Sequence, residues 1–358
     1  MIARSKCIGI LLGACSLFAW GLSLAAPGWA DENPLPEVSA PKIPTLHRNL
    51  DRASDFAPAG VLLDHTHERG DWTFLYRYER VLNDQLMRGE TTLTSAEYQA
   101  DYYPPAGGYT STPLSQLSEV HRFGVMYAPH ERFTLAMLLP FVQNRLDQEL
   151  SGGVFDRQRS SGIGDARFIV LLPFMQKGSQ KTQFNVALSL PTGSIRVADS
   201  NGNRLPYSMQ HGSGSWDVYW GLTYTGKHRR LAWGAQVESQ YRIGSNDLGY
   251  ELGAVYQASG WLAGELGNWF SVTARLGWIK TENIKGADPA LNPATSPLND
   301  PLKQAGTRVE MGPGVNILVP IFGGQRLSFE ALFSLYQSVD GPQLAPDVKF
   351  NAGWQWLF

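Results

Sequence analysis

The stretch DHTH, residues 64–67, carries residue types that can bind a metal ion. Successive side chains of an extended chain point to opposite sides, so His65 and His67 would share one face with Asp64 beside them. Two imidazoles and a carboxylate are a ligand set for zinc, copper or nickel. The sequence therefore predicts Asp64, His65 and His67 as metal ligands. The alternative is that they are ordinary polar residues in a lead-in to a strand.

A second stretch, HGSGS at residues 211–215, places a histidine near a serine. A serine nucleophile needs a base within hydrogen-bond reach, and His211 precedes Ser213 by two residues. Gly212, Gly214 and the neighbouring serines are instead typical of a flexible loop end. We therefore predict that the protein is not an enzyme and that it holds no cofactor.

The elements that would position these residues are strands, because polar and apolar residues alternate along much of the chain. Leu231 and Trp233 alternate with Arg230 and Gln236, and the same pattern recurs at residues 131–141, 268–278, 306–319 and 324–336. Strands of soluble sandwiches usually have about five or six residues, and a tilted strand needs about nine to eleven to cross a bilayer. These segments run about ten to thirteen residues, which favours strands that span a membrane.

About twelve such strands follow one another, and the connections between them alternate in length. The expected strand centres are Phe74, Gly124, Met137, Ile169, Val186, Gly221, Gln236, Gly253, Ala274, Val315, Ala331 and Gly353. Long connections are expected at 81–115, 143–162, 192–213, 281–305 and 340–346, and short ones near Pro129, Lys177 and Lys227 and at 260–268 and 323–324. Only the connection after Ile243 is short where a long one is due.

Long loops on one side and short turns on the other are typical of Gram-negative outer-membrane barrels. We therefore predict an all-β protein, a transmembrane antiparallel up-and-down β-barrel of about twelve strands, with both termini on the periplasmic side. The chain is 43% hydrophobic and 17% charged with a net charge of −2, which argues against a nucleic-acid partner. The expected location is the cell outer membrane, in contact with lipid and lipopolysaccharide.

Residues 1–30 have the form of a cleaved secretory signal peptide, with a cut near Ala30. A retained helix and lipidation at Cys15 are the alternatives. Residues 31–70 are expected to be a Pro-rich periplasmic lead-in and residues 71–358 the barrel with long extracellular loops. Both cysteines, Cys7 and Cys15, fall in the signal peptide, so the mature chain would have none.

The last segment, KFNAGWQWLF, places Trp354, Trp356 and Phe358 on one face. Aromatic rings favour the boundary between lipid headgroups and hydrocarbon, so this face is expected to meet lipid. A terminal phenylalanine on such a strand also resembles the signal that the outer-membrane barrel assembly machinery reads. We expect that machinery to be a partner of the chain.

The opposite faces of the strands carry charges of both signs, which would each cost a few kcal/mol if they faced lipid near the midplane. They are therefore expected to line the lumen. The candidates are Arg77, Glu79, Arg122, Arg167, Asp217, Arg230, Glu238, Arg242, Glu251, Arg275, Arg308, Glu310, Arg326 and Glu330. They either fill a narrow barrel as ion pairs, line a pore or hold a ligand, and the sequence leaves these alternatives open.

Three successive stretches carry a resemblance to a known family. They are GIGDARFIVLLPF (162–174), ALSLPTGS (187–194) and GSWDVYWGLTYTG (214–226). These resemble the outer-membrane transporter family named after the meta-pathway of phenol degradation, whose members show a G-x-GD strand, an LPTG turn and a G-x-G-x-xD strand. The matching residues here are Gly162, Gly164, Asp165, Leu190, Pro191, Thr192, Gly193, Gly212, Gly214 and Asp217.

That family is distantly similar to channels for fatty acids and aromatic hydrocarbons. The resemblance therefore implies passive passage of a small hydrophobic or aromatic solute through a gated barrel. We expect the connection at 81–115 to gate it, where Tyr98, Tyr102, Tyr103 and Tyr109 either contact the solute or pack the loop. The alternative functions are a non-transporting structural or adhesive barrel with a charge-locked lumen, and a metal-binding outer-membrane protein.

Overall fold

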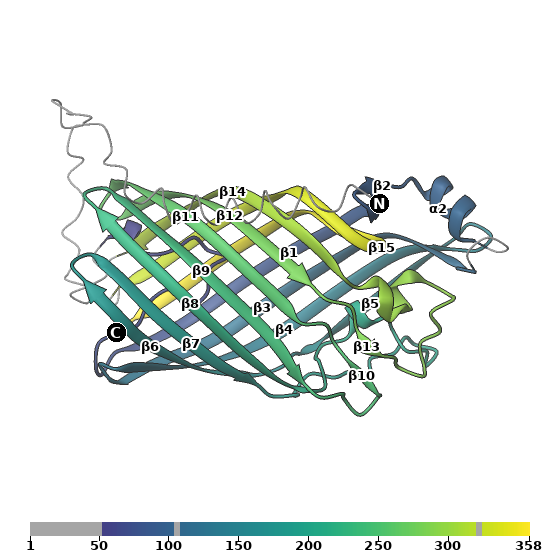
Figure 1. Ribbon diagram of the computed structural model, residues 1–358, viewed down its shortest axis with the longest axis horizontal. Coiled ribbons are helices and arrows are strands. Elements are labelled where there is room, and N and C mark those ends of the chain that lie inside the picture. The colour runs from purple at the N-terminus through teal and green to yellow at the C-terminus, as the bar shows by residue number, and fades with distance from the viewer. Residues whose placement is uncertain (1–51, 104–107, 320–323) are drawn as a thin grey trace, which may run out of the picture. The chain divides into compact units, whose positions relative to one another are not determined.

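The computed structural model describes residues 52–103, 108–319 and 324–358. The predicted signal peptide and residues 31–51 of the predicted lead-in lie outside the described residues. The long strands form one antiparallel sheet that closes on itself (Figure 1). They are β1 (Trp72–Gly89), β3 (Ser111–His130), β4 (Phe133–Leu150), β5 (Val154–Ile163), β6 (Arg167–Lys177), β7 (Gln180–Ser189), β8 (Trp216–His228), β9 (Leu231–Ile243), β11 (Val255–Gly267), β12 (Phe270–Thr281), β14 (Gly306–Val319) and β15 (Gln325–Leu357).

Strands that follow one another pair in the ring, except that β4 pairs with β5 through residues 141–150 and with β6 through residues 134–138, so β5 lies off the closed path. β15 pairs with β1 to close the ring. β15 has 33 residues and makes two passes: residues 325–339 pair with β14, and residues 339–357 pair with β1. Side chains join the two passes, since Arg326 donates to Gln355 and Asn351 donates to Glu330. Among the described residues the ring therefore has eleven labelled strands that make twelve passes, which confirms the predicted all-β barrel.

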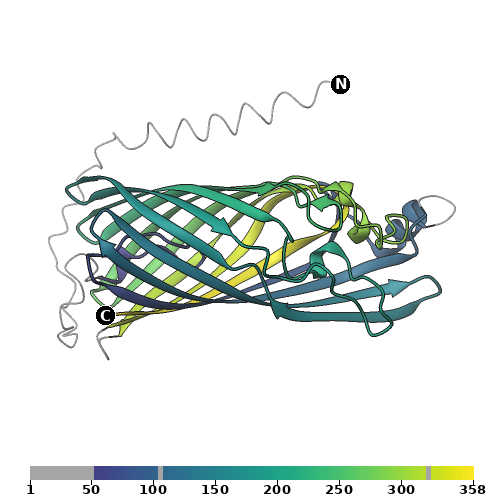
Figure 2. The same cartoon turned by 90° about the horizontal axis from the view of Figure 1, so that it is seen from below.

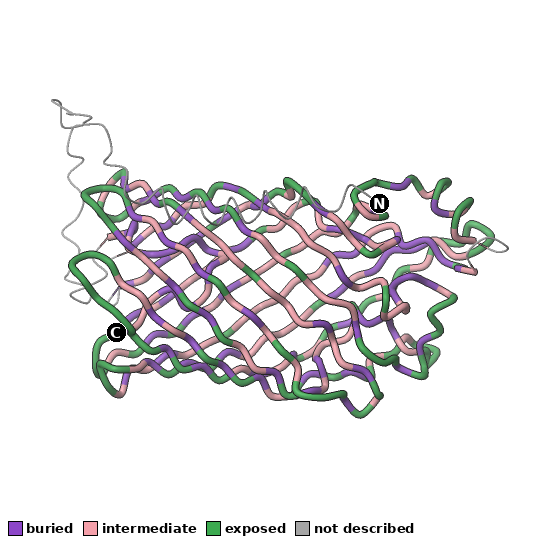
Figure 3. Tube along the Cα trace, viewed as in Figure 1, coloured by how far each residue is buried: buried purple, intermediate pink, exposed green. Residues whose placement is uncertain are grey.

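The alternation of residue types places apolar side chains outside and polar side chains inside, as expected for strands that meet lipid on one face. In β12, Val272 and Leu276 are exposed on the outside, whereas Ser271, Thr273 and Arg275 are buried within the ring. Figure 3 shows the same alternation of burial along many strands. The last pass of β15 follows the rule, because Phe350 and Phe358 are exposed while Asn351 and Gln355 are buried.

Short turns and long connections lie at opposite ends of the ring. We name the end with the C-terminus the short-turn end and the other the long-loop end (Figure 2). At the short-turn end, Trp72 donates its amide to the carbonyl of the terminal Phe358 over 2.9 Å, so the first and last described passes meet there.

Two predicted connections are wrong in position. The strand expected around Gly253 is β11, which begins at Val255, and Gly260 lies inside it opposite Ala235 rather than in a turn. Glycine suggested a turn there, but the ladder of hydrogen bonds continues through it. The connection after Ile243 is consequently 244–254, so it is not a break in the alternation of long and short connections.

The predicted loop at 143–162 is largely strand. β4 runs on to Leu150 and β5 begins at Val154, so the two strands form a hairpin that extends well past the expected end. β15 likewise continues through the expected loop at 340–346. Polar residues in these stretches suggested loops, but a strand outside the membrane can be polar on both faces.

The long-loop end also carries the small elements: β2 (Thr91–Thr92), α2 (Ser95–Tyr102), η3 (Tyr207–Met209), β10 (Tyr250–Glu251), β13 (Lys285–Gly286), η4 (Pro297–Asn299) and η5 (Pro301–Lys303). Helix α2 begins with a capping box, in which Thr94 Oγ1 accepts from the Glu97 amide and the Glu97 carboxylate accepts from the Thr94 amide. Among the described residues, no helix is long and apolar enough to cross a bilayer.

Candidate functional site

Residues 53–67, which we call the lumen segment, lie inside the ring near its short-turn end. They begin with η2 (Ala53–Asp55) and otherwise have no regular structure. Ala53 and Ala59 are fully buried, and Phe56 is 1% exposed. We expected this stretch as part of a periplasmic lead-in spanning residues 31–70. In the structure, its described part is packed against the inner wall of the barrel instead.

The wall binds the main chain of the lumen segment from several sides. Arg77 of β1 donates to the carbonyl of Val61 over 2.7 Å, and Arg326 of β15 donates to the carbonyl of Ala57. Amide side chains add donors from other strands: Asn316 of β14 to Phe56, Gln236 of β9 to Leu62, and Gln183 of β7 to Leu63. Because these strands lie on different sides of the ring, the segment crosses the lumen.

Two of the predicted lumen charges form a pair beneath the segment. Arg275 binds Glu330 through two hydrogen bonds of 2.8 Å, and Glu330 also accepts the amide of Gly60 over 2.9 Å. A Cβ atom at Gly60 would collide with the side chains of both Arg275 and Glu330, so only glycine fits there. The pair therefore holds the segment close to the wall while the two buried charges compensate each other.

The beginning of the segment is fixed to the short-turn end. Asp55 forms an ion pair of 2.7 Å with Lys227 at the end of β8. Arg52 binds Glu265 of β11 over 3.1 Å, and the amide of Ala53 donates to the carbonyl of Asn268 over 2.9 Å. The segment is thus attached both at its beginning and along its middle.

The predicted metal ligands all belong to this region, where they have other partners. Asp64 accepts the amide of Ala57 over 2.7 Å and binds His65 Nδ1 over 2.9 Å, while His67 Nε2 lies 3.3 Å from the hydroxyl of Thr73. In the described part of the chain, no group of three or more His, Cys, Asp and Glu side chains is arranged to hold a metal ion. The metal site stays a prediction.

The carboxyl of Asp64 is ionised in this setting. Its burial raises the pKa, but the adjacent His65 and the nearby Arg326 outweigh that effect and hold the pKa of Asp64 below its ordinary value. The charged Asp64 closes a turn of the lumen segment through its bond to the Ala57 amide. Its role is therefore to shape the segment.

A row of opposite charges runs along one side of the wall. Arg122 of β3 binds Glu79 of β1 over 3.1 Å, and Lys349 of β15 lies 3.4 Å from Glu79 and 3.6 Å from Glu310 of β14. Glu310 also lies within 4 Å of two further arginines, Arg275 and Arg308. Lys349 is a lumen charge that we did not predict, although its place on one face with Asn351 and Gln355 would have identified it.

A second charged group lies on the other side of the wall. Asp217 of β8 accepts from Gln240 over 2.9 Å and lies 3.4 Å from Arg242 of β9. The guanidinium of Arg167 lies 3.6 Å from the centre of the Tyr219 ring, a cation–π contact. Glu238 of β9 lies under Gly221 beside Asn185, so it too faces inward.

Two predicted lumen residues lie elsewhere. Arg230 is exposed in the turn between β8 and β9, because β9 begins one residue later than the alternation suggested. Glu251 is in β10, where it binds Lys285 of β13 over 2.8 Å at the long-loop end. Both assignments to the lumen are therefore wrong.

The three motifs that carry the family resemblance meet at one point. Asp165, between β5 and β6, accepts the amide of Gly193 over 2.8 Å and the amide of Ser213 over 2.7 Å. Thr192 donates its hydroxyl to the carbonyl of Gly164 over 2.8 Å and accepts the amide of Ala166 over 2.9 Å. The motif residues thus tie together the ends of β5, β6 and β7 and the start of β8, which is a structural role.

The histidine and serine of the HGSGS stretch do not form a catalytic pair in this arrangement. Among the described residues, the hydroxyl of Ser213 has Asp165, Ser215 and Asp217 as its partners. His211 lies over Gly162, whose missing side chain makes room for the ring. Burial lowers the pKa of His211.

The tyrosines of the first long connection pack the loops. Tyr98 is fully buried, donates to the carbonyl of Ser111 over 3.0 Å and stacks with Tyr109 at 6.1 Å between ring centres. They belong to a cluster from several loops and strand ends: Leu86, Leu93, Tyr98, Tyr109, Leu146, Leu205, Met209, Leu298 and Leu344, with Tyr102 and Tyr103 against it. Of the two roles that we considered for these tyrosines, contact with a solute and packing of the loop, the structure shows packing of the loop.

The long connections also bind one another directly. Thr110 donates its amide to the carbonyl of Thr295 over 3.0 Å, and Arg204 forms an ion pair of 3.3 Å with Asp288. The Asp288 amide donates to the hydroxyl of Tyr207 over 2.9 Å. The described parts of the long connections, residues 90–103, 108–110, 190–215 and 282–305, consequently form one packed layer at the long-loop end.

Comparison with known proteins identifies the architecture. No protein-family profile and no curated protein sequence matches the chain. An outer membrane channel from Pseudomonas putida F1 is similar in structure, with a TM-score of 0.56 and 15% identity over 83% of this chain and 99% of that one. The monoaromatic hydrocarbon channel TodX, as its deltaS2S3 mutant, gives a TM-score of 0.41 and 11% identity over 81% of this chain and 90% of that one.

A third structure, the KdgM porin, gives a TM-score of 0.39 and 7% identity over 79% of this chain and 98% of that one. Of these three structures, the Pseudomonas putida channel is similar enough to bear on the fold, and at 15% identity it bears on the fold alone. The likeness to the Pseudomonas putida channel, over nearly that chain's whole length, places this chain among the outer-membrane-type β-barrels.

Proposed function

We propose that the protein is an outer-membrane channel that lets a small hydrophobic or aromatic solute pass, and that the lumen segment is its gate. The observation that carries the proposal is a closed ring of strands with an apolar outer face, whose lumen is crossed by a segment without regular structure. Such a ring needs a lipid environment, and its inner wall is polar enough to admit water. The resemblance of the 162–226 motifs to the phenol meta-pathway transporter family supports the solute class.

The contacts of the segment suit a gate better than a permanent core. Much of its binding is by hydrogen bonds from flexible arginine and amide side chains to its main chain, at Ala57, Val61 and Leu62. Such a bond contributes about 0.5–1.5 kcal/mol net, or about 1.5–3 kcal/mol where an arginine donates, and water can replace each bond when the segment leaves, which favours reversible docking. The long-loop end faces the cell exterior and the short-turn end the periplasm in this proposal, with export by residues 1–30 and assembly through Trp354, Trp356 and Phe358.

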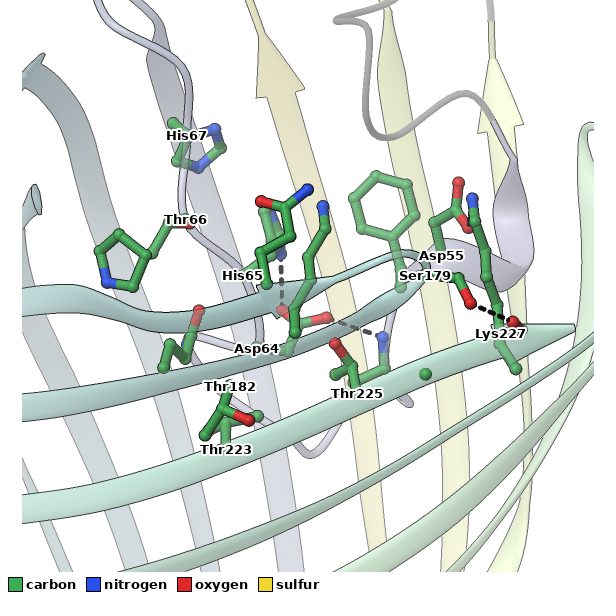
Figure 4. Close-up of a pocket in the computed structure, with 18 of the residues that line it drawn as sticks. Asp55, Asp64, His65, Thr66, His67, Ser179, Thr182, Thr223, Thr225 and Lys227 are labelled. Carbon is green, nitrogen blue, oxygen red and sulfur yellow. Dashed lines mark hydrogen bonds and ion pairs between the residues drawn. The ribbon is translucent and has the colours of Figure 1, made fainter. Parts of the chain in front are cut away.

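The gate assigned to the lumen segment replaces the one we expected at 81–115. Tyr98 and its neighbours hold the long connections together, so the layer at the long-loop end is a less mobile candidate. The lumen segment, in contrast, is fixed at its beginning by the ion pairs of Asp55 with Lys227 (Figure 4) and of Arg52 with Glu265, which are exposed enough to water on the basic side to open.

Planar bilayers test the function. The purified mature protein is expected to give brief channel openings, and a variant lacking residues 53–67 is expected to give sustained openings. A charge-locked structural barrel predicts no channels from either protein, because the paired wall charges would fill the lumen without the segment. Absence of openings from the deletion variant, when it migrates as a folded barrel, would remove the channel function.

A further inference from the structure

The hairpin of β4 and β5 carries three arginines on its outer face, near the long-loop end (Figure 1). Arg145 of β4 lies directly opposite Arg159 of β5, and Asp147 lies opposite Arg157 at the next outward pair. These side chains point away from the lumen, because Ser160 between the two arginines of β5 and their neighbours is buried and donates to a carbonyl of the loop layer over 2.8 Å. The arginines therefore belong to the outer wall of the barrel.

One carboxylate acts on all three arginines, but it does not satisfy them equally. Asp147 accepts two hydrogen bonds from Arg157, of 2.6 and 3.0 Å, and lies 3.8 Å from Arg145. Asp147 also attracts Arg159, but only at longer range. With the residues that the structure describes, Arg159 makes neither an ion pair nor a hydrogen bond, and Arg145 makes no hydrogen bond.

The other acidic residues around the hairpin have partners of their own. Glu149, further along β4, accepts from a side chain of helix α2 over 3.2 Å. Glu119 of β3 lies 3.9 Å from Arg80 of β1. Asp156 belongs to the opposite face of β5, where it accepts from Gln148 over 2.9 Å. Positive charge is therefore in excess on this face, and the excess lies at the pair of Arg145 and Arg159.

That pair places two like charges side by side. Directly opposite residues of an antiparallel ladder have their Cα atoms about 4.5–5.5 Å apart, and like charges at such positions destabilise the sheet. Each guanidinium also offers about five N–H donors in a planar fork that fits the oxygens of a phosphate. A phosphate between Arg145 and Arg159 would accept from both and cancel their repulsion.

The arginine pair lies just beyond the apolar band of the outer wall. Toward the short-turn end, the next two outward pairs are Gln143 with Ser161 and Phe141 with Ile163. Ile163 is 53% exposed, as expected for a side chain that meets lipid. Four residues of strand separate it from Arg159, which is about 13 Å along the strand and less along the membrane normal because the strands tilt. The guanidinium groups, on long side chains, can therefore reach the level of the lipid headgroups.

We propose that Arg145 and Arg159 together bind a phosphate group of lipopolysaccharide, whose acyl chains lie against the apolar surface around Ile163. The inference rests on the part of the proposed function that turns the long-loop end toward the cell exterior, because lipopolysaccharide is the phosphorylated glycolipid of the outer leaflet. It assigns the expected contact with lipopolysaccharide to two residues and to one chemical group of the lipid.

Native mass spectrometry tests the site, with the mature barrel refolded in detergent free of lipopolysaccharide and titrated with bisphosphorylated lipid A. Wild type should bind lipid A, and the double variant Arg145→Gln/Arg159→Gln should bind it at least about tenfold more weakly, since charge-assisted hydrogen bonds are lost. Each single variant should show part of the effect. Arg132→Gln is the matched control, because Arg132 is an exposed arginine in the turn before β4, at the other end of that strand.

Equal lipid A affinity in wild type and the double variant, with both barrels folded, would overturn the assignment of the arginine pair. Equal affinity of wild type for lipid A with and without its phosphates would overturn phosphate as the recognised group. Inorganic phosphate that displaces lipid A at equal concentration would overturn the glycolipid as the ligand. Bilayer openings without lipid A binding would reject the site and leave the channel function standing, whereas lipid A binding without openings would reject the channel and leave the site.

Discussion

Arg326 provides the sharpest test of how the lumen segment is held. It is 1% exposed, donates to the carbonyl of Ala57 and lies 4.6 Å from the centre of the Phe56 ring. Arg326→Gln removes one charge-assisted hydrogen bond and one desolvated cation–π contact, worth about 1.5–3 and up to about 2 kcal/mol. Docking should weaken by about 2–4 kcal/mol in total, which shifts the docking equilibrium roughly 30- to 1000-fold.

The assay is the rate at which a maleimide labels a cysteine introduced at Ala59, which is fully buried when the segment is docked. The only native cysteines are Cys7 and Cys15 in the predicted signal peptide, so the mature protein offers one labelling site. Labelling in Arg326→Gln should be faster by the same factor as the docking shift. Arg122→Gln is the control, because Arg122 binds Glu79 on the wall. Unchanged labelling in a folded Arg326→Gln barrel would refute the reasoning.

Three further predictions concern the segment and the motif residues. Gly60→Ala should displace the segment and lengthen channel openings in bilayers, because the new methyl group collides with Arg275 and Glu330; openings like those of wild type would contradict this. Asp165→Asn should lower the free energy of unfolding by about 1–3 kcal/mol, because amides of Gly193 and Ser213 lose a charged acceptor; the exposed Asp247→Asn is the control for this denaturation experiment. The pKa of Asp64 is depressed in the folded state, so its stabilisation of the segment is complete above the ordinary value of 3.8 and is lost as the pH falls further below it. Labelling at position 59 should therefore rise only below about pH 4, and Asp64→Asn should remove that rise.

The barrel could be predicted from the sequence because the residue types of each strand show by themselves which face is apolar and which is polar. In residues 270–278 the exposed Val272 and Leu276 alternate with the buried Ser271 and Arg275, and no knowledge of other strands is needed to read the pattern. The boundaries were less predictable. Gly260 fits a strand or a turn equally well by itself, and only its partners Ala235 and Leu276 decide the matter.

The lumen segment could not be predicted for a related reason. Its main chain is bound by side chains far away in the sequence, such as Arg326 and Gln236, so the segment needs no periodic pattern of its own. The sequence pattern could place the charges of the wall inside the barrel. Which partner each charge binds, however, depends on the register between strands. Arg275 and Glu330 hold the segment, whereas Glu79 and Arg122 bind each other, and spacing along the chain does not distinguish these two pairs.

Movement of the lumen segment is the event that opens the barrel in the proposed channel. Cysteines placed at Leu62 and Gln236, where the Gln236 side chain donates to the Leu62 carbonyl over 3.0 Å, allow the segment to be tethered to β9 by a short cross-linker that a reductant cleaves, since the two main chains are a side chain's length apart. In single-channel recordings, the cross-linked protein should show no openings, and reduction should restore brief ones. Identical conductance before and after reduction, with the cross-link verified on a gel, would contradict the account.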